Sequence, residues 1–97
     1  MTLQELHALF ELHESESHKF ENIQNKRSQR PDLHAFLLLD ELVPGSRDII
    51  SAAEHDEVYL EVSPEALAEV ATSNIVLELR RCGIRYDRSL DSIAMFV

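Results

Sequence analysis

A run of histidines and glutamates near the N-terminus contains the residue types best suited to chemistry. The stretch ELHALFELHESESHKFE, residues 5–21, holds three histidines and five glutamates. If this stretch is helical, its spacings of four, three and four residues place His7, Glu11, Glu14 and His18 on one face. Imidazole nitrogens and carboxylate oxygens on one face are the groups that bind a metal ion or exchange protons.

The apolar residues of the same stretch favour a simpler interpretation. Leu6, Leu9, Phe10 and Phe20 form a stripe on the opposite side of the helix, so the His/Glu face is turned toward water. A zinc site needs three or four ligands with supporting hydrogen bonds, and the His-Glu-x-x-His spacing of metalloproteases is absent. We therefore predict a solvated face of His–Glu pairs. His13 lies near the stripe, and we expect it to be a partly buried core or interface residue.

The other reactive side chains lack partners in the pattern. His55 and Asp56 are adjacent, and neighbours in a strand point to opposite faces, so a turn is the simpler interpretation. Ser51 and Ser63 lack the glycines of a nucleophile elbow. Cys82 is on the apolar face of a predicted helix, which favours a buried structural thiol over a reactive one. We predict no catalytic residue, no cofactor and no bound metal.

Four arginines gather near the C-terminus: Arg80, Arg81, Arg85 and Arg88. The favoured interpretation is internal pairing, in which Arg85 reaches Glu57 or Glu61 on a neighbouring strand. The alternative is a small patch that binds an anion or an acidic partner.

The charge pattern bounds the class of partner. The net charge is −9, and residues 32–69 hold ten acids and a single base, Arg47. Such a surface repels phosphates, so we expect no direct nucleic-acid binding and no membrane binding. The N-terminus lacks the pattern of a signal peptide, and no apolar run approaches the ~18 residues of a membrane helix. Together with the single cysteine, these features predict a cytoplasmic protein.

The first half of the chain is predicted to be helical. Thr2 and Glu5 form a capping box at the start of a helix of about 25 residues, which the basic pair Lys26 and Arg27 would end. Pro31 then suits the first turn of a second helix, which Pro44-Gly45 stops. The connection is short, so we expect these helices to form an antiparallel hairpin.

The second half is predicted to be mixed. Residues 57–62 alternate as a half-buried strand, and Ser63-Pro64 begins a helix. A further helix ends at Gly83, and two strands follow as a hairpin. Residues 46–56 fit a strand or a helix, with the strand slightly favoured. The last strand is apolar on both faces, so it is either central in the sheet or covered by a partner.

These elements predict a single α+β domain over residues 1–97. Residues 1–45 form the helical hairpin, and residues 46–97 form a ββααββ or βααββ unit with two further short helices. The hairpin packs on a small sheet of three or four largely antiparallel strands. The block from Glu54 to Val97 resembles, in general character alone, small accessory proteins of bacteriophages and mobile elements, and no residue pattern in it specifies a function.

We expect an acidic protein–protein interaction module without catalytic activity, which associates with itself as a homodimer. Its candidate interaction residues are Phe10, Phe20, Tyr59, Phe96, Asp56, Glu57, Glu61, Arg81 and Arg85. The first alternative is an acidic inhibitor that imitates nucleic acid on a basic enzyme, motivated by the acidic central segment. The second alternative is a small metal-dependent enzyme that uses the histidines.

Overall fold

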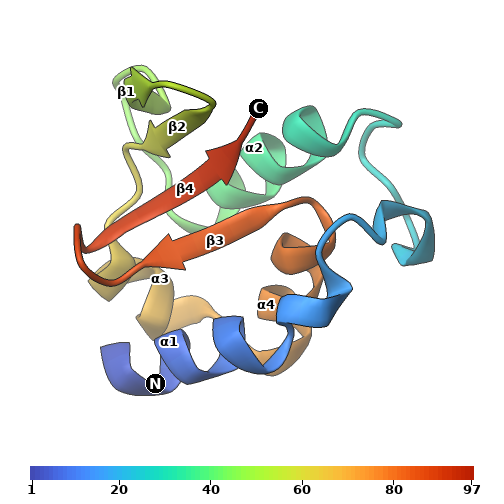
Figure 1. Cartoon of the computed structure of the whole chain (residues 1–97), viewed down its shortest axis with the longest axis horizontal. Coiled ribbons are helices and arrows are strands. Elements are labelled where there is room, and N and C mark those ends of the chain that lie inside the picture. The colour runs from blue at the N-terminus through green and yellow to red at the C-terminus, as the bar shows by residue number, and fades with distance from the viewer.

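The computed structural model describes all 97 residues. Its elements run in the order α1 (Leu3–Leu12), two short 3-10 turns η1 (Glu14–Glu16) and η2 (Phe20–Asn22), α2 (Pro31–Leu42), β1 (Ile50–Glu54), β2 (Glu57–Leu60), α3 (Pro64–Val70), α4 (Ser73–Arg81), β3 (Ile84–Asp87) and β4 (Ser92–Phe96). The helices and the four-stranded sheet confirm the α+β class (Figure 1).

The sheet has the order β1-β2-β4-β3, and every neighbouring pair is antiparallel. The strand that we favoured within residues 46–56 is present as β1. The last strand, β4, lies between β2 and β3, which confirms the central position that was one of its two predicted placements. Strands β1 and β3 are therefore the two edges of the sheet.

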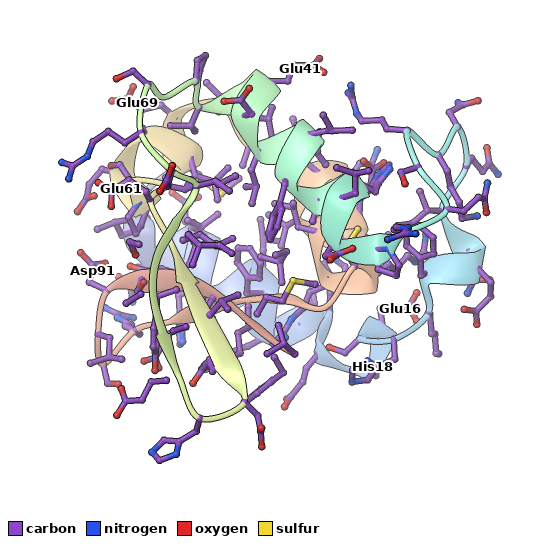
Figure 2. All side chains as sticks on the ribbon, turned by 90° about the horizontal axis from the view of Figure 1, so that it is seen from above. Glu16, His18, Glu41, Glu61, Glu69 and Asp91 are labelled. Atoms are coloured by element: carbon purple, nitrogen blue, oxygen red, sulfur yellow. The ribbon has the colours of Figure 1, made fainter.

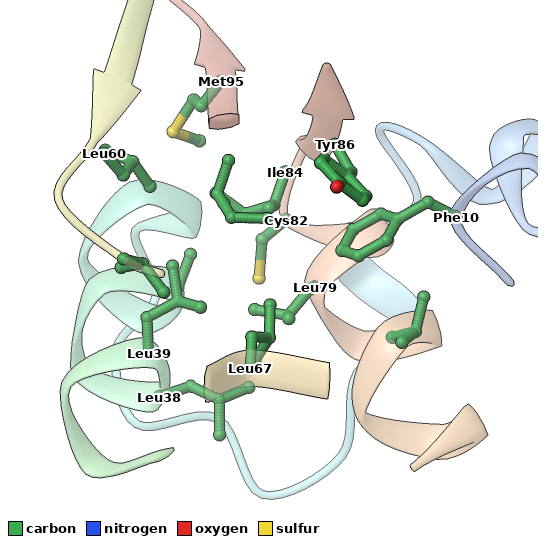
Figure 3. Packing of buried hydrophobic residues seen from close by; sticks show 14 of the residues in the cluster. Phe10, Leu38, Leu39, Leu60, Leu67, Leu79, Cys82, Ile84, Tyr86 and Met95 are labelled. Atoms are coloured by element: carbon green, nitrogen blue, oxygen red, sulfur yellow. The ribbon is translucent and has the colours of Figure 1, made fainter. Parts of the chain in front are cut away.

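One face of this sheet packs on the helices. Leu60, Ile84, Tyr86 and Met95 point from the strands toward a core that also contains Leu38 and Leu39 of α2, Leu67 of α3, Leu79 of α4 and Phe10 of α1 (Figure 3). The alternating burial of β2 and β3 follows from this arrangement, since successive side chains point to opposite faces. The opposite face, which we call the outer face, has no helix over it.

Local signals set most helix boundaries. The capping box of Thr2 and Glu5 is formed, with hydrogen bonds of 2.9 and 3.1 Å. Ser63 caps α3 ahead of Pro64, as the sequence predicts. Gly83 ends the α4 segment with φ of +94°, a left-handed conformation that glycine adopts without a side-chain penalty.

The prediction of a first helix of about 25 residues is wrong. Helix α1 ends at Leu12, and the segment after it forms the two 3-10 turns, with His18 at φ of +69°. Residues 13–19 contain no apolar side chain, so continuing the helix would have buried nothing. Arg80 also holds the end of α1, because its Nε donates to the Phe10 carbonyl oxygen at 2.7 Å. Helix α1 makes its main contacts with α3, α4 and β3 and not with α2, so the two N-terminal helices do not form the expected antiparallel hairpin.

No helix in the structure is both long enough and apolar enough to cross a lipid bilayer.

Candidate interaction surface

The fold separates the nine candidate interaction residues into buried, engaged and exposed groups. Phe10 is 1% exposed in the core and offers no surface to a partner. Phe20 is partly buried against the His34 ring and beneath the Lys26 ammonium. Arg81 is engaged by Glu16 at 2.7 Å. Asp56 lies exposed in the β1–β2 turn, and Glu61 is exposed just after β2.

The remaining four residues come together on the outer face of the sheet. Glu57 and Phe96 are cross-strand partners, and Ala94 is paired with Tyr59 on one side and with Arg85 on the other. Paired residues of antiparallel strands point to the same face, so the pairing places all of these side chains side by side. With Asp87 they form the outer-face cluster: Glu57, Tyr59, Arg85, Asp87, Ala94 and Phe96.

Arg85 is the centre of this cluster. Its guanidinium forms ion pairs with Glu57 and with Asp87, and it lies 4.7 Å from the centre of the Phe96 ring. The internal pairing of Arg85 with Glu57 is therefore confirmed. Arg85 is on β3 and Glu57 is on β2, with β4 between these two strands. The β4 residue next to Arg85 is Ala94, whose small side chain is completely buried, so the Arg85 side chain can extend over it to Glu57.

The acids of the outer-face cluster are also held by hydroxyl groups. The Tyr59 hydroxyl donates to Glu57 at 3.0 Å. The Ser89 hydroxyl donates to Asp87 at 2.6 Å, and this hydrogen bond, with the Leu90 N–H and the nearby Arg85 charge, lowers the pKa of Asp87. The charges of this face are thus paired within the chain, while Phe96 remains 61% exposed.

A hollow of about 980 Å³ adjoins the cluster along the free edge of β3. Arg85 and Phe96 line it on the sheet side, and the α1–η1 segment lines it on the other side with His7, Glu11, Glu14 and His18. His7 contacts Glu11 at 3.2 Å and meets the Tyr86 ring edge-on, 5.8 Å between ring centres. The hollow therefore collects the His/Glu residues that the sequence placed on one helix face.

These residues do not form a metal centre. No group of three His, Cys, Asp or Glu side chains is arranged to bind one metal ion. Glu11, Glu14 and His18 are exposed, as predicted for a solvated face, although η1 and not a continuing helix carries Glu14. His55 is also exposed, in the β1–β2 turn.

The role of His34 was not predicted from the sequence. This ring is 1% exposed, its Nδ1 accepts from the Arg27 N–H at 3.0 Å, and its Nε2 contacts the Glu78 carboxylate at 3.1 Å. With Nδ1 accepting, Nε2 carries the proton and donates to Glu78. The burial of His34 could have been predicted from its position four residues before Leu38, since this spacing places both side chains on the same, buried face of α2.

Cys82 is buried as predicted. Burial raises the pKa of its thiol to about 12, with a smaller effect of the Glu78 charge, so the reactive thiolate is scarce at neutral pH.

Comparison of the chain with known protein families, with curated proteins and with solved structures found no match.

Proposed function

We propose that this protein is a non-catalytic interaction module of the cytoplasm that associates with a second copy of itself through the outer face of its sheet. The observation that carries the proposal is the exposure of Phe96 at one end of a sheet face that no helix covers. A large exposed aromatic side chain within a surface of small and paired polar groups is typical of the centre of a protein interface.

Charge limits where a second copy can dock. Two molecules of net charge −9 repel one another, so they can meet only where the local charge is compensated. The outer-face cluster comes close to this condition, because Arg85 is paired with both Glu57 and Asp87 of its own chain, which leaves one negative charge in excess. A two-fold axis near Phe96 brings the two aromatic rings together without leaving a charged group unpaired.

The test is to measure the oligomeric state of a variant in which Phe96 is replaced. We expect the wild type to dimerise at micromolar to tens-of-micromolar concentration in sedimentation equilibrium. Phe96→Ser should raise the dissociation constant about 30-fold, which corresponds to the ~2 kcal/mol typical of an interface hot spot. Leu12→Ser is the matched control, because Leu12 is 70% exposed but lies at the end of α1, outside the cluster.

Two results contradict the proposal. One is a wild type that remains monomeric at several hundred micromolar. The other is an equal effect of Leu12→Ser and Phe96→Ser, which indicates general hydrophobic association and no defined face. Both side chains are exposed, so the variants should unfold at temperatures close to that of the wild type.

An acidic inhibitor of a basic enzyme is the second candidate function. It is supported by the number of acids within residues 32–69 that form no ion pair, among them Asp48, Asp56, Glu61 and Glu69. Glu41, Glu61 and Glu69 lie at the periphery and point outward (Figure 2).

A further inference from the structure

The edge strand β1 is exposed along its whole length. All five of its residues are exposed, and Ile50 retains 43% of its accessible surface. It has β2 on one side and no strand on the other, so alternate residues leave backbone N–H and C=O groups open. Strand β1 is held to the protein mainly by backbone hydrogen bonds to β2. The Glu61 N–H adds one more, which it donates to the Ile49 carbonyl oxygen at 2.6 Å.

This edge has a bulge but lacks two other features that commonly protect an open strand. Lysine and proline are absent from β1, and its middle residues are small. A bulge lies at Ser51, where the register shifts, and the strand then pairs regularly from Ala52 to Glu54. Ala52 is on the outer side of the sheet and Ala53 on the inner side, so an added strand finds room for its side chains on both faces.

Exposed acids lie at both ends of this edge. Asp48 and Glu61 lie at one end, where Ile49 bonds to Glu61, and Glu54 and Asp56 lie at the turn. The only ion pair among these four acids is the 3.9 Å contact of Glu54 with His55. Glu61 points outward beside the hairpin in Figure 2. The concentration of negative charge repels a second β1 edge and attracts a cationic chain.

We propose that β1 binds an extended, basic segment of another protein, which adds a strand to the sheet. Backbone hydrogen bonds to the open edge would supply sequence-independent affinity, and lysine or arginine side chains at each end would meet the two acidic pairs. The five residues of β1 span roughly 13 Å at ~3.3 Å per step, so the cationic residues of the partner are about four positions apart. This edge lies beside the outer-face cluster that we assign to self-association: Glu57 and Tyr59 of the cluster are on the neighbouring strand β2, and Phe96 is one strand further away.

The probe is a fluorescent ten-residue peptide, rich in valine and threonine, with two lysines four positions apart. Fluorescence anisotropy measures its affinity, and ¹H–¹⁵N spectra of the protein report the site. We expect binding to shift the amide signals of Ala52 and Ala53. A version with glutamates in place of the lysines, and a version N-methylated at alternate residues along its pairing edge, should each bind at least tenfold more weakly.

The matched protein variants separate local charge from total charge. Asp56→Lys combined with Glu61→Lys should weaken binding about tenfold, because two attractive contacts become repulsive. Glu14→Lys combined with Glu21→Lys makes the same change in net charge within the segment that contains Glu16 and His18, which lies on the opposite side of the molecule from Glu61 (Figure 2). This control should change the affinity less than twofold.

The proposal is overturned if the unmodified peptide does not bind at millimolar concentration, or if the N-methylated version binds equally well. Equal effects of the two charge-reversal variants also overturn it, since they indicate nonspecific attraction. The Phe96→Ser variant is the control for the outer-face cluster. It should leave peptide binding unchanged, so loss of self-association and loss of peptide binding are distinguishable.

Discussion

Replacement of His34 tests whether a buried imidazole joins three segments of the chain. His34 accepts a hydrogen bond from the Arg27 N–H and donates one to Glu78, so it connects the loop before α2, helix α2 and helix α4. His34→Leu keeps an apolar body of similar size and removes both hydrogen bonds. The Arg27 N–H then loses its partner, while Glu78, whose side chain is 32% exposed, can turn to water.

The magnitude follows from these two losses. An orphaned donor costs ~1–3 kcal/mol when buried, and the lower half of this range applies to the partly buried Arg27 N–H; the net loss of a hydrogen bond to a charged group costs ~1.5 kcal/mol. We therefore expect the free energy of unfolding to fall by about 3 kcal/mol and the melting temperature by about 12–20 °C for a domain of this size. Urea unfolding followed by circular dichroism measures the change, which should appear in the midpoint with an unchanged slope.

Two further variants assign the loss to each nitrogen. His34→Asn places an oxygen near the position of Nδ1 and should retain the acceptor for Arg27, whereas Glu78→Gln removes only the charge of the other partner. We expect Glu78→Gln to cost about 1 kcal/mol, well below the cost of His34→Leu. A loss of less than 1 kcal/mol for His34→Leu would refute the role of the imidazole as a connector. A Glu78→Gln variant as unstable as His34→Leu would refute the importance of the Arg27 contact.

Two other perturbations follow from the core and from the end of α1. Burial raises the pKa of Tyr86 from 10.0 to about 12, and the 2.5 Å hydrogen bond to Asp91 is the second cause of this increase. Burial also raises the pKa of Cys82 from 9.0 to about 12. Both neutral forms are favoured in the folded state, so their contribution to stability is complete below pH 9 and is lost as the pH rises toward 12. Tyr86→Phe should flatten this fall in alkaline urea titrations, and a thiol reagent at pH 8 should modify Cys82 rapidly only after unfolding; fast modification of the native protein would contradict this. Arg80→Met removes the hydrogen bond to the Phe10 carbonyl and should cost about 1–2 kcal/mol in thermal unfolding, whereas Arg88→Met, on the exposed β3–β4 turn, should cost less than 0.5 kcal/mol. Equal losses for the two arginines would show that the contact with α1 is unimportant.

Elements with short-range signals were predictable from the residues alone. The capping box at Thr2, the Ser63-Pro64 helix start and Gly83 after α4 each depend on contacts within a few residues, so their outcome did not require the rest of the chain. The central position of β4 was one of the two alternatives that its apolar faces predicted, and the pairing with β2 and β3 confirms it. The burial of Cys82 followed from its place on an apolar helix face.

The length of α1 and the composition of the two surfaces depended on long-range packing. Arg80, 70 positions away, bonds to the Phe10 carbonyl, and a local pattern contains no information about such a partner. The order β1-β2-β4-β3 decided that Arg85 reaches Glu57 across Ala94, and it left β1 as an open edge. Strand order results from how the helices cover one face of the sheet, which is a property of the whole core and of no single segment.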